Sequence, residues 1–177
     1  DFIKDACSNA DIPFYIIESN LYADYMNNFG KSHVSAIPFW SVDENGKKAK
    51  MRRQCTVDYK ITLIEKFMRY NLLGYKKYQR LKTEDFQAHE MHIGFSYEER
   101  RRINPKELSK LYIKKYPLVD MKWERSDSYK YILEVWGLDT KASACCFCPF
   151  HKNYFFEFLR VNYKSEYERL VEFDNLI

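Results

Sequence analysis

Three cysteines of this chain have the residue type and spacing of metal ligands. Cys145 and Cys148 form a C-x-x-C pair near the end of the sequence, and Cys55 lies far from them in the first third. Two thiolates spaced in this way can bind one metal ion or one edge of an iron–sulfur cluster. The sequence therefore predicts a zinc or 4Fe–4S site if the fold returns Cys55 to the pair. Three buried, inert cysteines are the alternative.

The sequence leaves the fourth ligand of this site open. Cys146 and His151 are the candidates within the chain, and an external ligand is a third choice. An open position suits a catalytic centre, whereas a fourth protein ligand suits a structural site. The chain has five cysteines, three of them within four positions, which fits disulfide pairing poorly and favours a reducing, cytoplasmic location.

Basic residues close to Cys55 are candidates for binding phosphate. Residues 47–53 include Lys47, Lys48, Lys50, Arg52 and Arg53, and contain no acid. Arginine binds phosphate oxygens through two parallel hydrogen bonds, and lysine adds a point charge. A solvated loop is the plain alternative.

A second group of candidates lies further along the chain. Arg102 follows a predicted strand and turn, and Arg125 is placed either to bind a substrate or to pair with Asp127. Ser126 or Asp127 is most simply the N-cap of a helix.

Composition limits the class of protein. The chain has 177 residues, 46% of them hydrophobic, and a net charge of +4. These values predict one ordered domain and do not by themselves indicate a nucleic-acid partner. No apolar run is long enough to predict a membrane span, and the first residues lack the features of a signal peptide. Because the chain begins at Asp1, we expect a fragment or a processed product.

The pattern of apolar residues predicts alternating strands and helices. Strands are expected at 12–18 and 91–96, a strand or extended segment at 116–121, an extended segment at 36–42 and a turn at 43–46. Helices are expected at 1–9, 21–29, 56–73, 105–115, 126–136, 153–161 and 165–176, and a helix or tight turn at 97–102. Thr56 is a candidate cap for the long helix, and Gly74 and Gly137 are expected to end helices. We predict a single α/β domain over 1–177 with a mainly parallel sheet. Its sheet-and-helix core covers 1–125, and its helical part, which carries the C-x-x-C loop, covers 126–177.

Five ordered motifs give the chain a family resemblance. They are R-Q-C-T at 53–56 with Y-K-I at 59–61, I-G-F-S-x-E-E at 93–99 with Arg102, Y-P-L at 116–118, W-x-R-x-D at 123–127 and S-A-C-x-x-C-P-F at 143–150. Together they resemble the adenine nucleotide α-hydrolase-like (PP-loop) proteins described as phosphoadenosine phosphosulfate reductase-like, many of them bacterial or phage-encoded. The resemblance covers about 12–173.

This resemblance implies a Rossmann-like fold that binds ATP or a related adenylate. By position, Cys55, Cys145 and Cys148 correspond to cluster or metal ligands. Arg53, Lys60, Arg102, Arg125 and Asp127 correspond to residues on the substrate side. The implied activity is ATP-dependent sulfur transfer, or nucleotide or nucleic-acid modification, with nucleic acid as a further partner.

The chain departs from this family in three places. The family's Ser-Gly-Gly-x-Asp-Ser-like phosphate loop is missing, since no Gly-Gly occurs anywhere. Ser128 stands where many relatives have Cys, and no Glu-Cys-Gly-x-His tail is present, which argues against classical sulfate reduction. We therefore expect an N-terminally truncated fold. Either a second chain supplies the loop, or the chain is truncated, or the activity has been lost.

A different class of function is also consistent with the sequence. In this alternative, zinc stabilises the C-terminal loop of a non-catalytic module, and the basic run binds nucleic acid or a partner protein. A scaffold without either activity is the third hypothesis.

Overall fold

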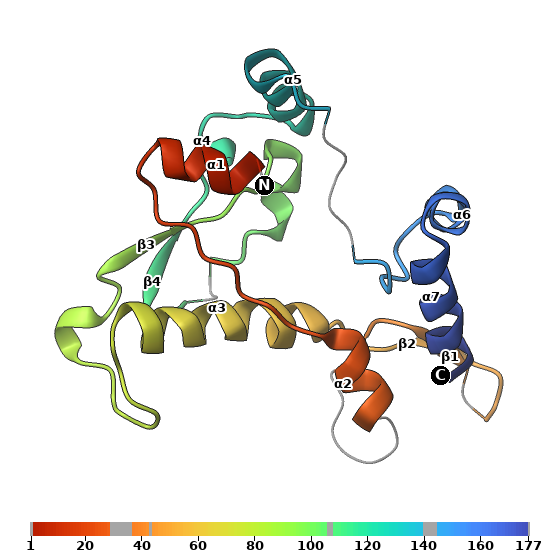
Figure 1. Cartoon of the computed structure of the whole chain (residues 1–177). Helices are drawn as coiled ribbons and strands as arrows, with labels where there is room; N and C mark the ends of the chain where they lie inside the picture. The colour runs from red at the N-terminus through yellow and green to blue at the C-terminus, as the bar shows by residue number, and fades with distance from the viewer. Residues whose placement is uncertain (1, 29–36, 43, 106–107, 140–144, 177) are drawn as a thin grey trace. The chain divides into compact units, whose positions relative to one another are not determined.

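The computed structural model describes residues 2–28, 37–42, 44–105, 108–139 and 145–176 (Figure 1). The helices named α are α1 (Phe2–Asn9), α2 (Leu21–Asn28), α3 (Thr62–Phe67), α4 (Pro117–Asp120), α5 (Arg125–Trp136), α6 (Asn153–Asn162) and α7 (Lys164–Leu176). The strands are β1 (Trp40–Val42), β2 (Lys48–Lys50), β3 (His89–His92) and β4 (Tyr112–Lys115). Two π-helical segments, η1 (Val57–Ile61) and η2 (Met68–Leu72), and two 3₁₀ segments, η3 (Thr83–Asp85) and η4 (Tyr97–Arg102), complete the set.

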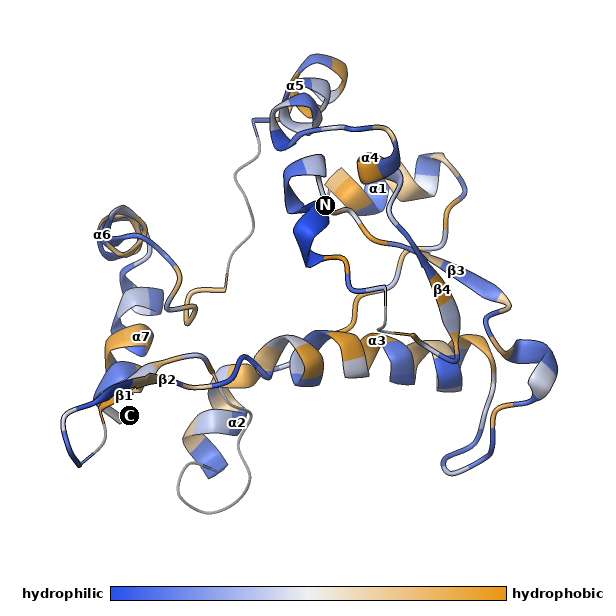
Figure 2. Ribbon diagram, turned by 180° about the vertical axis from the view of Figure 1, so that it is seen from behind, coloured by the Kyte–Doolittle hydropathy of each residue, from blue (hydrophilic) through white to orange (hydrophobic). Residues whose placement is uncertain are grey.

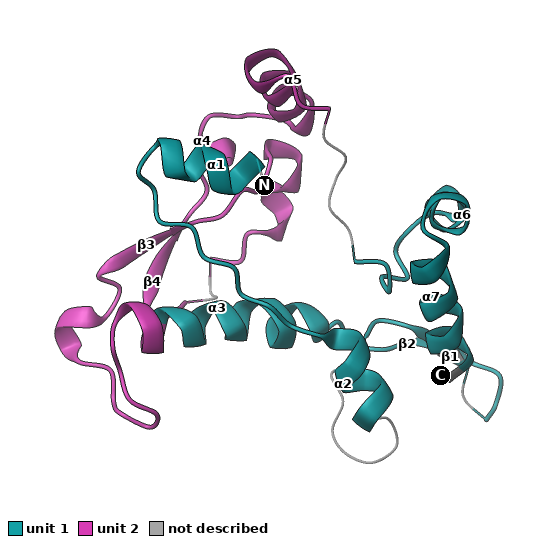
Figure 3. Cartoon of the chain, viewed as in Figure 1, with its two compact units in different colours: residues 1–68, 144–177 teal, residues 69–143 magenta. Residues whose placement is uncertain are grey.

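These elements belong to two compact units (Figure 3). The first, which we call the thiol unit, contains residues 1–68 and 144–177, and the second, the parallel-strand unit, contains residues 69–143. The sequence predicts one domain with a sheet-and-helix core up to residue 125 and a helical part after it. The two units describe which residues pack together, so this division stays a prediction.

The core of the thiol unit is aromatic. Phe173 of α7 is 1% exposed, and Tyr25 of α2 is 4% exposed. The rings of Tyr25 and Phe147 have their centroids 4.7 and 4.9 Å from that of Phe173, within the range of favourable aromatic pairs. Ile37, at 2% exposure, completes the buried cluster. Phe147 belongs to the loop that carries Cys145, Cys146 and Cys148, which we call the cysteine loop. Its packing in this core therefore holds the cysteine loop against α2 and α7.

One long helical stretch follows Cys55, as the sequence predicts. It runs through η1, α3 and η2, and α3 carries both apolar and polar residues in Figure 2. Its first residues are wound as a π-helix, a form that recurs at functional sites. Gly74 then adopts a φ of +68°, a left-handed conformation that suits glycine. Thr56 has helical backbone angles and makes no capping bond through its side chain, so its predicted role as a cap is wrong.

A short hairpin precedes this helix. Strands β1 and β2 pair antiparallel, with Trp40 opposite Lys50 and Val42 opposite Lys48. The predicted turn between them is confirmed at residues 44–46, where Gly46 has a φ of +78°, and Asp43 lies outside the described residues.

The second unit contains the parallel strands. β3 and β4 pair in register from His89 opposite Tyr112 to His92 opposite Lys115. Helix α5 begins with a capping box, in which Asp127 accepts a hydrogen bond from the Glu124 N–H at 2.8 Å. It ends, as predicted, at Gly137, whose φ is +65°.

Several predicted elements differ from the structure. Residues 12–18 form no strand, because no described strand pairs with them. All of these residues are exposed. The strand predicted at 116–121 is wrong, since Pro117 begins α4 there. Residues 112–115 form β4, so the predicted helix ending at 115 is also wrong. The strand expected at 91–96 is confirmed only as far as His92.

The predicted fold class is confirmed at its coarser level. The chain has a mixed α/β structure with a small parallel sheet. The helices predicted at 1–9, 21–29, 126–136, 153–161 and 165–176 are found with bounds shifted by at most one residue, apart from residues 1 and 29, which are not described. Ser126 and Asp127 lie inside α5, so Glu124 is the N-cap and their predicted role as caps is wrong.

Candidate functional site

The three predicted ligand cysteines reach one cavity through two different local structures. Cys55 lies where the chain enters the long helical stretch. Cys145 and Cys148 lie in a tight turn, in which the Cys148 N–H donates to the Cys145 carbonyl at 3.0 Å. Ser143 and Ala144, the start of that motif, lie outside the described residues. All five cysteines are free thiols.

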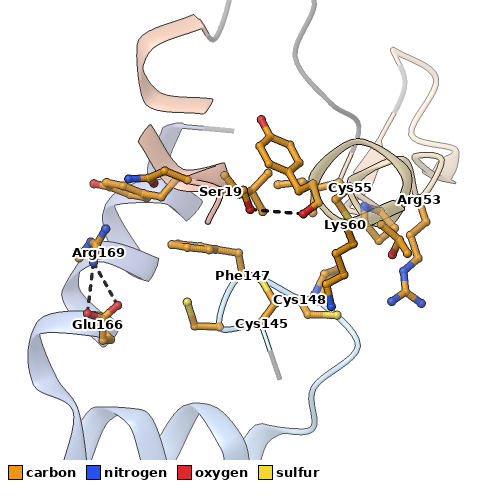
Figure 4. A pocket seen from close by; sticks show the side chains of 18 residues that line it. Ser19, Arg53, Cys55, Lys60, Cys145, Phe147, Cys148, Glu166 and Arg169 are labelled. Carbon is orange, nitrogen blue, oxygen red and sulfur yellow. Dashed lines mark hydrogen bonds and ion pairs between the residues drawn. The ribbon is translucent and has the colours of Figure 1, made fainter. Parts of the chain in front are cut away.

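The cavity lies entirely within the thiol unit and has a volume of about 390 Å³ (Figure 4). Four thiols line it, from Cys55, Cys145, Cys146 and Cys148. The other lining residues are Ser19, Asn20, Leu21, Tyr22, Ile37, Pro38, Arg53, Thr56, Tyr59, Lys60, Phe147, Pro149, Glu166 and Arg169. The fold therefore brings Cys55 to the C-x-x-C turn.

The thiols are close enough to affect one another electrostatically. Desolvation raises the pKa of Cys145 above its ordinary value, although the residue is exposed overall. Negative charge on Cys148 or Cys55 raises this pKa further, while the charge of Lys60 lowers it. A group of thiols that disfavour one another's ionisation is a place where a bound cation would be stabilising.

Two predicted basic residues also line the cavity. Tyr59 and Lys60 follow Cys55 by four and five positions at the start of the helical stretch, so the three residues lie on one side of it. Arg53 lies at the edge of the cavity in Figure 4, away from Cys145 and Phe147. Its guanidinium carbon is 5.8 Å from the centroid of the Phe150 ring. Positive charge is thus present both inside the cavity and at its mouth.

Tyrosine side chains of the cavity stay neutral at physiological pH. Desolvation and a hydrogen bond to Asp24 raise the pKa of Tyr59 to about 12. A hydrogen bond to Glu172, 2.5 Å from the Tyr22 hydroxyl, raises the pKa of Tyr22. Both phenols therefore keep their protons, and neither adds negative charge to a site that would bind an anion.

Helix α7 contributes residues that the sequence analysis did not identify. The Arg169 Nη1 lies 3.2 and 3.3 Å from the two carboxylate oxygens of Glu166, as the dashed lines in Figure 4 show. The Arg169 guanidinium carbon lies 4.6 Å from the Tyr22 ring centroid, and that ring stacks on Phe147 at 5.5 Å. No local motif marks these positions, because only the packing of α7 against the cysteine loop brings them to the cavity.

The cysteines that line the cavity are of the residue type that binds zinc or an iron–sulfur cluster. The side chains do not form a closed shell, because the described residues contain no group of three or more His, Cys, Asp or Glu positioned to hold a metal ion. Of the predicted fourth ligands, Cys146 lines the same cavity. The His151 ring instead hydrogen-bonds the Cys145 carbonyl at 2.9 Å and stacks on Phe155 at 3.7 Å. Cys146 is therefore the better placed of the two.

The remaining predicted residues belong to the parallel-strand unit and form an ion-pair cluster there. Arg102 pairs with Glu99, and the Arg125 guanidinium lies 3.8 Å from the same carboxylate. The Arg125 N–H donates to Glu98 at 3.1 Å, and the Asp127 carboxylate accepts the Glu124 N–H in the capping box of α5. Each of these residues has a structural partner in its own unit, and none lines the thiol cavity.

Comparisons with known proteins give no further assignment. No protein family, no curated protein and no solved structure matches the chain. Within the described ranges, every helix is too short or too polar to cross a membrane.

Proposed function

We propose that this chain binds an adenine nucleotide, ATP or a related adenylate, in the thiol cavity, and that Cys55, Cys145 and Cys148 hold a zinc ion or an iron–sulfur cluster beside it. The observation that carries the proposal is the meeting of these three thiols with Lys60 and Arg53 around one cavity. The activity would be sulfur transfer or nucleotide modification of the phosphoadenosine phosphosulfate reductase-like kind.

The cavity residues suit the parts of a nucleotide. Lys60 supplies a point charge for phosphate oxygens, and Arg53 supplies a planar fork at the mouth. The Tyr22 ring, which lines the cavity and stacks on Phe147, offers an apolar surface to a purine. Positive groups that polarise the α-phosphate of ATP would favour attack on its phosphorus by a sulfur or oxygen nucleophile, with pyrophosphate as the leaving group.

The thiols suit a soft cation. Cys55, Cys145 and Cys148 would bind it as thiolates, and Cys146 or an external group would take the fourth position. A zinc ion bound there would hold the three thiols together beside the nucleotide site, and an iron–sulfur cluster would supply one-electron chemistry. The raised pKa of Cys145 means that binding releases protons, so affinity rises with pH.

A Rossmann-like, adenine nucleotide α-hydrolase-like fold remains part of the proposal. The parallel pairing of β3 with β4 supports it, because parallel strands require a crossover connection of the kind that such folds repeat. The sheet has two strands in the described residues, fewer than a complete fold of this type contains.

Calorimetric titration with ATP tests the nucleotide part. Wild-type protein should bind, and Lys60→Gln should weaken binding about tenfold or more, the usual loss for a hydrogen bond to a charged group. Lys164→Gln is the matched control, because that side chain is 82% exposed on α7 and does not line the cavity. Equal affinities for wild type and Lys60→Gln, or no binding by wild type, would contradict the proposal.

A second candidate function is a zinc-stabilised binding module. The favouring observation is that Cys55 and the Cys145–Cys148 turn come from distant parts of the sequence yet meet in one unit, so a metal would tie them together. A chelator that lowers thermal stability in a protein without ATP affinity would select this candidate.

A further inference from the structure

Exposed aromatic and basic side chains gather on the β1–β2 hairpin and the end of the cysteine loop. Trp40 of β1 is 66% exposed, and Phe150 is 49% exposed. The ammonium group of Lys50 lies 5.8 Å from the Trp40 ring centroid and 3.9 Å from the Phe150 ring centroid. We call the surface formed by Trp40, Lys48, Lys50, Arg53 and Phe150 the hairpin face.

The charge of this face has one sign. The strand and the segment after it, residues 47–53, are exposed throughout and carry five basic residues and no acid. Figure 2 colours the turn between β1 and β2 as hydrophilic. Such a patch attracts a polyanion by Coulomb forces.

The exposed rings of Trp40 and Phe150 indicate which class of polyanion the hairpin face would bind. Large exposed aromatic residues next to cations are costly to leave in water, and they stack well on flat, electron-poor partners. A single-stranded nucleic acid offers such bases together with phosphates, and proteins bind it through aromatic side chains set in a basic groove. A duplex hides its base faces, and an acidic peptide offers carboxylates without them.

We propose that the hairpin face binds single-stranded nucleic acid, with bases stacked on Trp40 and Phe150 and phosphates against Lys48 and Lys50. Arg53 belongs both to this face and to the thiol cavity, so a bound strand would run to the mouth of the cavity. The inference rests on the hairpin face alone and holds whether or not the cavity binds ATP.

Fluorescence anisotropy with labelled oligo(dT) and oligo(U) of about 15 nucleotides tests it, since sites for single strands span about 4–16 nucleotides. Phe150→Ala and Trp40→Ala should each weaken binding about tenfold, the typical loss for one stacked base. Lys50→Gln should lower the slope of log affinity against log salt by about 0.7. Comparison of the two oligonucleotides tells DNA from RNA.

Two variants control for charge and for aromatic exposure in general. Lys164→Gln removes one exposed charge from α7. Tyr78→Ala removes a ring that is 88% exposed and lies 5.1 Å from the Lys77 ammonium group, but belongs to the other unit. Both should bind as wild type does.

The proposal has clear contrary outcomes. It is overturned if neither oligonucleotide binds at low salt, if a duplex of the same length binds as tightly, or if Tyr78→Ala weakens binding as much as Phe150→Ala. Circular dichroism of each variant confirms folding, and Trp40→Phe, which keeps a ring, should retain most of the affinity. If the oligonucleotides do not bind but ATP binds normally, then the hairpin face is not a nucleic-acid site, and the proposed nucleotide site in the thiol cavity is unaffected.

Discussion

Removal of the Phe173 side chain should destabilise the thiol unit more than any other single truncation we consider. Phe173 is 1% exposed, and its ring centroid lies 4.7, 4.9, 5.6 and 6.4 Å from those of Tyr25, Phe147, Phe39 and Tyr22. Burial of a phenylalanine in such a core is worth about 3–5 kcal/mol when the residue is truncated to alanine. Its four aromatic neighbours place the expected loss for Phe173→Ala near the upper end, at about 4 kcal/mol.

Urea unfolding followed by far-UV circular dichroism measures this loss. Phe173→Leu keeps most of the volume and should cost about 1–2 kcal/mol, so it stays measurable if the alanine variant does not fold. Val161→Ala, at 75% exposure on α6, should change the free energy of unfolding by less than about 0.5 kcal/mol. A loss below about 1 kcal/mol for Phe173→Ala would refute the packing described for this core.

Truncation of Phe173 should also affect the cysteines of the candidate site. Phe147 packs on Phe173 and lies between Cys146 and Cys148. A cavity under Phe147 should loosen the turn and speed alkylation of Cys146, whose pKa is raised by burial in the folded chain. If Phe173→Leu leaves the alkylation rate unchanged, then the core does not position the thiols.

Two further predictions concern pH and backbone conformation. Because the pKa of Tyr59 is raised from 10.0 to about 12, its neutral form stabilises the fold below pH 10, and this stability is lost as pH rises from 10 to 12. Tyr59 is partly exposed, so solvent screening limits the effect to about 1 kcal/mol, and thermal melts should show wild type losing stability relative to Tyr59→Phe between pH 9 and pH 11.5. Gly137→Ala should lower the free energy of unfolding by about 1 kcal/mol, because Gly137 has a φ of +65° at the end of α5. An unchanged urea midpoint for Gly137→Ala would contradict the claim that the end of α5 requires glycine.

The sequence predicts best where local signals agree with packing. Helical periodicity and Gly74 predict the stretch after Cys55, and Gly137 predicts the end of α5. The apolar run at 12–18 misleads, because a strand requires a partner that the run itself cannot specify. Pro117 fits both an extended segment and the first turn of a helix, and the helix is found.

In the candidate site too, local sequence signals predict some residues, and packing alone places the others. Spacing alone identifies Cys145 and Cys148 as a pair, the basic run points to Arg53, and the family resemblance points to Lys60. Arg169 could not be predicted, because its place at the cavity depends on how α7 packs. Arg102 and Arg125 resemble substrate residues in sequence, and the structure pairs them with acidic neighbours.

Titration with Co²⁺ under anaerobic conditions tests the central claim most directly, because thiolate ligands give cobalt an intense near-ultraviolet charge-transfer absorption. Wild-type protein should develop this absorption, and Cys55→Ser and Cys148→Ser should lose most of it. Cys7→Ser should behave as wild type, since Cys7 does not line the cavity. If Cys55→Ser binds cobalt with the wild-type spectrum and affinity, then Cys55 does not join the C-x-x-C pair, and the proposed three-thiolate site is wrong.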